Sequence, residues 1–105
     1  MIEFRSPLAP DANSDKVALV TGGGTGIGRA VARELVWTGA RVAICGRRPE
    51  PLQATQAELG DACLVVPTDV REPEQVAALV ERTLERFGRI DVLVNNAGGQ
   101  FLAPA

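Results

Sequence analysis

A glycine-rich turn, Thr21-Gly22-Gly23-Gly24-Thr25-Gly26-Ile27-Gly28, follows a short apolar run and opens a helical pattern. Glycines reach backbone conformations closed to other residues, and without side chains they let the main chain approach a ligand closely. The N–H groups that open the following helix supply donors, and the helix dipole favours negative charge. The turn therefore predicts a site for a diphosphate, with a flexible linker as the alternative for three successive glycines.

Four short apolar runs alternate with longer amphipathic segments, and the turn follows the first of these runs. Such runs are typical of strands buried on both faces of a parallel sheet. They occupy residues 17–20, 41–45, 63–66 and 90–94. Between them the sequence predicts three helices, from Ile27 to near Gly39, from Pro49 toward Gly60 and from Pro73 to Gly88, because proline favours a helix start and glycine a helix end.

Each predicted helix carries apolar residues at helical spacing, suited to packing on a sheet. In the first helix these are Ile27, Ala30, Val31, Leu35 and Val36. The second helix has a thinner face, anchored by Leu52 and Leu59. The third has the stripe Val76, Leu79, Val80, Thr83, Leu84 and Phe87, which we expect to be core. The order β-α-β-α-β-α-β predicts an α/β fold with a parallel sheet between flanking helices.

The composition is that of an ordinary globular domain, with 46% hydrophobic residues, 23% charged residues and a net charge of -2 over 105 residues. No charge run suggests a nucleic acid partner. No apolar stretch reaches the roughly 18 residues of a membrane span, so we expect no membrane partner and a cytoplasmic location. Cys45 and Cys63 have no histidine beside them to complete a zinc site, and we expect two buried thiols and no metal.

Two arginines follow the second predicted strand, where dinucleotide folds select their cofactor. A fold that prefers NAD usually places an acid there, to bind the ribose 2′-hydroxyl. Here no Asp or Glu occurs between Glu34 and Glu50, and the strand runs into Arg47 and Arg48. A guanidinium can bind a 2′-phosphate through charge-assisted hydrogen bonds, so the sequence favours NADP over NAD. A solvated loop is the alternative.

Polar residues also follow the third and fourth predicted strands. Asp69-Val70 ends the third strand, where an aspartate could accept a hydrogen bond from the adenine amino group or, equally, bond loop N–H groups in an Asx-type turn. The segment Asn95-Asn96-Ala97-Gly98-Gly99 ends the fourth strand. Its amides could bridge neighbouring strand ends and its small residues could leave room for a ribose or nicotinamide, with a polar turn as the alternative.

Together these motifs resemble the classical short-chain dehydrogenase/reductase family over residues 16–99. The family's TGxxxGxG turn is matched by Thr21, Gly22, Gly26 and Gly28, its adenine-side aspartate by Asp69, and its NNAG motif by residues 95–98. The resemblance implies an N-terminal half of a Rossmann-type fold with strand order 3-2-1-4. It implies roles in binding NADP for Gly22, Thr25, Gly26, Ile27, Gly28, Arg47, Arg48, Asp69, Val70, Asn96, Ala97 and Gly98.

Residues 95–105 look like the trans-2-enoyl-CoA and 2,4-dienoyl-CoA reductase branch of the family, which implies an enoyl thioester substrate. Ketoreductases of 3-oxoacyl thioesters, or other alcohol and ketone enzymes of the family, are the alternative. The family's catalytic Ser and Tyr-x-x-x-Lys pair have no counterpart here, because the chain contains no tyrosine and its one lysine, Lys16, precedes the first strand. We therefore expect no catalytic residue in these 105 residues and no activity from them alone.

The predicted organisation is an irregular leader at 1–15, an NADP-binding half-domain at 16–99, and the truncated start of a further segment at 100–105. In the order 3-2-1-4 the run 90–94 is an exposed edge and one face of the sheet is half covered, so we expect the segment alone to be marginally stable or prone to association. The complete family protein is expected to be a homo-oligomer. Two alternatives of another class are a nucleotide-binding module without catalysis and a half-domain that complements a second chain.

Overall fold

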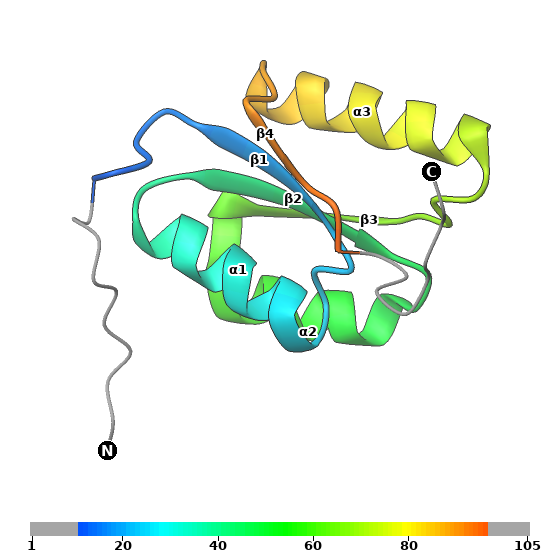
Figure 1. Cartoon of the computed structure of the whole chain (residues 1–105), viewed down its shortest axis with the longest axis horizontal. Coiled ribbons are helices and arrows are strands. Elements are labelled where there is room, and N and C mark those ends of the chain that lie inside the picture. The colour runs from blue at the N-terminus through cyan, green and yellow to red at the C-terminus, as the bar shows by residue number, and fades with distance from the viewer. Residues whose placement is uncertain (1–10, 97–105) are drawn as a thin grey trace.

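The structure, a computed structural model, describes residues 11–96 (Figure 1). Its strands are β1 (Val17–Thr21), β2 (Arg41–Gly46), β3 (Cys63–Pro67) and β4 (Val92–Val94). Its α-helices are α1 (Gly26–Trp37), α2 (Pro49–Leu59) and α3 (Pro73–Phe87), and a short 3-10 helix, η1 (Gly60–Ala62), follows α2. The predicted alternation of strands and helices is confirmed.

The four strands form one parallel sheet in the order β3-β2-β1-β4, which confirms the predicted order. Leu19 in β1 pairs with Ala43 in β2 on one side and with Leu93 in β4 on the other. The glycine-rich turn therefore leaves the sheet between the ends of β2 and β4, where the strand order reverses. Ligands of open α/β sheets bind in the crevice at that point.

Helices cover the two faces of the sheet unequally. In Figure 1, α1 and α2 lie together on one face and α3 lies alone on the other. The core under α1 and α2 is formed by Ala18, Val20, Ala32, Val42, Ile44, Leu52 and Cys63. The core under α3 is formed by Leu19, Ala43, Cys45, Leu64, Val66 and Leu79. Strands β1, β2 and β3 send alternate residues to the two cores, as strands buried on both faces require.

The apolar face predicted for α1 is wrong at its first turn. Ile27 is 74% exposed and Ala30 is also exposed, whereas Gly28 and Ala32 are the buried positions of the helix. Gly28 must face the sheet, and Ala30 lies about 200° around the helix from it, at 3.6 residues per turn. Leu35 and Val36 pack against the core as predicted.

The stripe predicted as core on α3 is also only partly buried. Leu79 and Thr83 are buried and Phe87 packs against the same core, but Val80 is 37% exposed and Leu84 44% exposed. Helix α3 packs on β3 and β2. The side of α3 that carries Val80 and Leu84 faces away from these strands, and no described helix lies beside it on this face of the sheet. Leu93 of β4, on the same sheet face as Leu19, is 65% exposed. We call Val80, Leu84 and Leu93 the uncovered face.

Three hydrogen bonds fix the end of the sheet opposite the turn and the segment before β1. The backbone N–H of Val17 donates to a carboxylate oxygen of Asp91 at 2.9 Å, and the N–H of Asp91 donates to the carbonyl of Val17 at 2.8 Å. The Asn13 amide donates to the hydroxyl of Thr38 at 2.7 Å, which joins the segment before β1 to the end of α1. None of the described helices combines the length and apolar character needed to cross a membrane.

Candidate functional site

The glycine-rich turn is compact because its main chain folds back on itself. Gly22 has a φ of 67°, in the left-handed region that favours glycine. A Cβ added at Gly28 would overlap the carbonyl oxygen of Gly22 and lie 2.7 Å from its carbonyl carbon and 2.9 Å from the Asn96 amide nitrogen. Only glycine allows the start of α1 to approach β1 this closely.

The N-terminus of α1 is open toward the turn. Thr25 precedes the helix in an extended conformation, its side chain makes no capping hydrogen bond, and the first turn holds no acidic residue. Thr25, Gly26 and Ile27 are all exposed. The N–H groups of this turn, together with the positive end of the helix dipole, form a favourable site for an anion.

The segment after β4 is fixed beneath the turn by Thr21. The Thr21 hydroxyl accepts a hydrogen bond from the backbone N–H of Asn96 and lies 3.3 Å from the carbonyl oxygen of Val94 and the side-chain oxygen of Asn95. The Asn96 amide nitrogen lies 3.2 Å from the position of a Cβ on Gly22. Asn96 therefore lies against the turn, and its predicted role in binding the cofactor stays a prediction; Ala97 and Gly98 lie outside the described residues.

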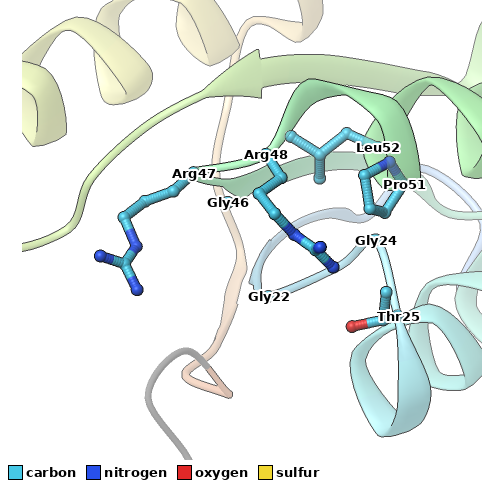
Figure 2. Close-up of a pocket in the computed structure, with 8 residues that line it drawn as sticks. All are labelled: Gly22, Gly24, Thr25, Gly46, Arg47, Arg48, Pro51 and Leu52. Carbon is cyan, nitrogen blue, oxygen red and sulfur yellow. The ribbon is translucent and has the colours of Figure 1, made fainter.

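An open pocket of about 460 Å³ lies between the turn and the end of β2 (Figure 2). It is lined by Gly22, Gly24, Thr25, Gly46, Arg47, Arg48, Pro51 and Leu52. In Figure 2, Arg48 extends toward Gly24 and Thr25, whereas Arg47 points away in the opposite direction. The volume of the pocket is within the range of about 300–1,000 Å³ typical of small-ligand sites. The Arg48 guanidinium group faces the pocket, and none of the described residues that line it carries a carboxylate, so the pocket suits an anion.

Asp69 and Val70 lie on the loop between β3 and α3 and are not among the residues that line the pocket. The Asp69 carboxylate accepts hydrogen bonds from the Arg71 backbone N–H, Nε and Nη2 at 3.0, 3.0 and 2.9 Å. These bonds, with a smaller contribution from the charge of Arg47, lower the pKa of Asp69 to about 2. Asp69 is therefore an ionised acceptor near Arg47, and it also makes the turn bond that the sequence left as an alternative.

The sequence carries a family signature across this site and the whole sheet. The short chain dehydrogenase family matches residues 16–105. The chain belongs to this family. The match begins one residue before β1 and includes every strand and helix that holds the turn and the pocket.

Curated relatives of this chain include 2,4-dienoyl-CoA reductases. The peroxisomal 2,4-dienoyl-CoA reductase of Danio rerio is 45% identical over 109 residues, which cover 100% of this chain and 36% of that protein. The Arabidopsis thaliana protein of the same description is 42% identical over 103 residues, which cover 95% of this chain and 35% of that protein. The chain thus spans about a third of the length of these relatives.

Two solved structures share the fold and contain different cofactors. A 3-ketoacyl-(acyl-carrier-protein) reductase from Brucella melitensis, complexed with NADH, has a TM-score of 0.77 and 38% identity over 78% of this chain and 34% of its own. The C-domain of a bacterial malonyl-CoA reductase, with NADP, has a TM-score of 0.80 and 35% identity over 85% of this chain and 16% of its own. A nicotinamide dinucleotide is common to both.

Several groups at the site were not predicted from the sequence. Pro51 and Leu52 form one wall of the pocket. Gln75 accepts a hydrogen bond from the backbone N–H of Asp69 at 2.8 Å, and Arg71 holds the Asp69 carboxylate. The spacing of Asp69 and Arg71, two residues apart, was a signal for this contact. Among residues 11–96 no group of three His, Cys, Asp or Glu side chains could hold a metal ion.

Proposed function

We propose that this chain is the cofactor-binding portion of an NADPH-dependent oxidoreductase that reduces an acyl thioester. The observation that carries the proposal is the pocket between the glycine-rich turn and the end of β2, which Arg47 and Arg48 line. It combines a backbone site for a diphosphate with two cations at the strand end that meets the adenosine ribose in this type of sheet.

The residues present fit the cofactor in three places. Gly22, Gly24 and Gly26 place no side chain over the uncapped N-terminus of α1, so a diphosphate can reach its N–H groups. Arg47 and Arg48 are exposed and can donate to a 2′-phosphate. The ionised Asp69 can accept a hydrogen bond from the adenine amino group. When bound, NADPH supplies the hydride, while these residues bind the dinucleotide and orient it.

Cofactor choice rests on the charges at the end of β2. Similarity alone leaves both cofactors open, because one similar structure contains NADH and the other NADP. A carboxylate in this position would accept from a 2′-hydroxyl and repel a 2′-phosphate, whereas the two arginines attract the phosphate. The arginine pair therefore favours NADPH.

For the substrate we favour an enoyl thioester. The support is the 45% identity with a protein described as a 2,4-dienoyl-CoA reductase. A 3-oxoacyl thioester is the second candidate, favoured by the similarity to a 3-ketoacyl-(acyl-carrier-protein) reductase. A 2,4-dienoyl-CoA and a 3-oxoacyl thioester, each offered with NADPH to the protein that contains this chain, distinguish the two by which one supports NADPH oxidation. The cytoplasmic location stays a prediction, and the first relatives are described as peroxisomal.

The cofactor assignment is tested by titrating NADPH and NADH into the chain and into the double variant Arg47→Ala/Arg48→Ala. We expect the variant to bind NADPH at least about tenfold more weakly, since charge-assisted hydrogen bonds contribute about 1.5–3 kcal/mol each before solvent screening. Its affinity for NADH should change less than about twofold, because NADH lacks the 2′-phosphate.

The control is Arg82→Ala, which removes one positive charge from α3, outside the pocket. It should leave both affinities unchanged. An equal loss for NADPH and NADH in the double variant would show that the arginines act on the whole dinucleotide and would overturn the 2′-phosphate assignment.

A further inference from the structure

Arg71 occupies most of the hydrogen-bonding capacity of the Asp69 carboxylate. The backbone N–H and Nε of Arg71 both donate to Oδ1, and its Nη2 donates to Oδ2. An ionised carboxylate has about four lone-pair positions on its two oxygens. Three are filled from one residue, so a single acceptor position remains, on Oδ2.

The orientation of this carboxylate is fixed from both sides of the loop. The backbone N–H of Asp69 donates to the side-chain oxygen of Gln75 at 2.8 Å, which ties Asp69 to the first turn of α3. The neighbouring Thr68 N–H donates to the carbonyl of Gly46 at 2.7 Å, which continues the pairing of β3 with β2 to the edge of the pocket. The Asp69 side chain is 22% exposed and that of Arg71 is 72% exposed, so the guanidinium shields the carboxylate from the solvent side.

We propose that Arg71 is a positioning residue for base recognition: it holds the Asp69 carboxylate so that one oxygen offers one acceptor to the base. This inference rests on the proposed binding of a dinucleotide, with Asp69 at the adenine. A 6-amino group can donate to that acceptor. A 6-oxo group, as in hypoxanthine, would meet a carboxylate oxygen with another acceptor and be rejected. Without Arg71 the carboxylate can rotate and hydrate, and this discrimination should decrease.

The test compares NADPH with its deamino analogue, which carries hypoxanthine in place of adenine and is otherwise identical. Because the two ligands have the same charge and the same phosphates, any general loss of positive charge cancels in the ratio of their dissociation constants. We expect the unmodified chain to prefer NADPH by about tenfold, as for a hydrogen bond to a charged group. Arg71→Gln should reduce this preference about threefold or more, since the acceptor is then no longer fixed.

Two further variants separate positioning from the loss of a charge. Arg71→Lys keeps the charge but lacks the fork, and should recover only part of the preference. Arg82→Gln removes the same charge from α3 and should keep the full preference. Circular dichroism and urea unfolding establish that each variant is folded, and the exposed position of Arg71 favours this.

Asp69→Asn makes the possible failures distinguishable. If Asp69→Asn removes the preference for NADPH while Arg71→Gln leaves the preference unchanged or increases it, Asp69 recognises the base without Arg71. The inference about Arg71 is then overturned. If neither variant alters the preference, Asp69 does not contact the base, and the inference fails while dinucleotide binding stands. Absence of NADPH binding by the unmodified chain would overturn the proposed function itself.

Discussion

The Thr21 hydroxyl, at the end of β1, accepts a hydrogen bond of 2.7 Å from the backbone N–H of Asn96, two residues beyond β4. Thr21 is buried, so this bond is protected from water. The bond connects Thr21, the first residue of the glycine-rich turn, to the segment that follows β4, an edge strand of three residues. The position of the turn therefore depends on β4 as well as on β1.

Replacing Thr21 tests this connection. Thr21→Val keeps the shape and removes the hydroxyl, which leaves the Asn96 N–H without its acceptor. We expect a loss of about 1–3 kcal/mol in the free energy of unfolding, the range for an unsatisfied buried polar group, measured by urea unfolding. Thr21→Ser restores the hydroxyl and should recover most of the stability. Equal stability of the Val and native chains would show that the bond contributes nothing.

Glu58 joins α1 to α2 and should make stability depend on pH. Its Oε2 accepts from Arg33 at 2.6 Å and its Oε1 accepts from Arg29 at 2.8 Å, and these bonds, Arg33 first, lower the pKa of Glu58 to about 2. Because the folded pKa lies below the ordinary value, the contribution is complete above about pH 4.5 and is lost as the pH falls toward 2. With a side chain 32% exposed, solvent screening reduces it to about 1 kcal/mol.

Urea unfolding at a series of acidic pH values measures this loss. In Glu58→Gln the stability above pH 4.5 should be lower, and the decrease with acid smaller, than in the native chain. Glu81→Gln, on the exposed side of α3, is the control and should keep the native pH dependence. Identical profiles for Glu58→Gln and the native chain would exclude the proposed contribution of Glu58.

The two cysteines should be unreactive until the chain unfolds. Cys45 and Cys63 are fully buried, and burial raises the pKa of each thiol to about 11. Since the thiolate is the reactive form, both burial and pKa oppose modification. Reaction with a disulfide reagent, followed as urea increases, should coincide with the unfolding transition for both thiols. Rapid modification of either one in the native chain would contradict its position in the core.

The uncovered face, Val80, Leu84 and Leu93, should drive association of this chain. Leu93 lies on an edge strand, and exposed apolar edges promote pairing with other molecules. Sedimentation velocity at increasing concentration should show growing species, and Leu93→Lys should reduce them. Gln53→Lys, which adds the same charge on the exposed side of α2, is the control. Strictly monomeric behaviour of the native chain would contradict this prediction.

The apolar runs predicted the sheet well, because a strand buried on both faces has few alternatives in sequence. The apolar runs alone do not predict which helix residues face that sheet. The close approach of Gly28 to Gly22 rotates α1 so that Ile27 is exposed, and the position of α3 over β3 and β2 leaves Leu84 exposed. Both depend on packing between segments far apart in the chain.

The candidate site was predictable where one local segment forms it. The turn and the arginines after β2 are contiguous motifs, and the structure brings both to one pocket. The partners of Asp69 were harder to predict from the sequence, since an aspartate after a strand can bind a ligand, a loop N–H or a nearby arginine. Which of these partners is bound depends on the side-chain rotamer and the loop geometry. In the structure the Asp69 carboxylate accepts hydrogen bonds from the backbone N–H and the side chain of Arg71.

The most direct test of the central claim is the ratio of the dissociation constants of the unmodified chain for NADH and NADPH, measured by titration under one salt condition. With Arg47 and Arg48 at the pocket and no carboxylate among the described residues that line it, we expect NADPH to bind at least about tenfold more tightly than NADH. Equal affinities, or tighter binding of NADH, would contradict it.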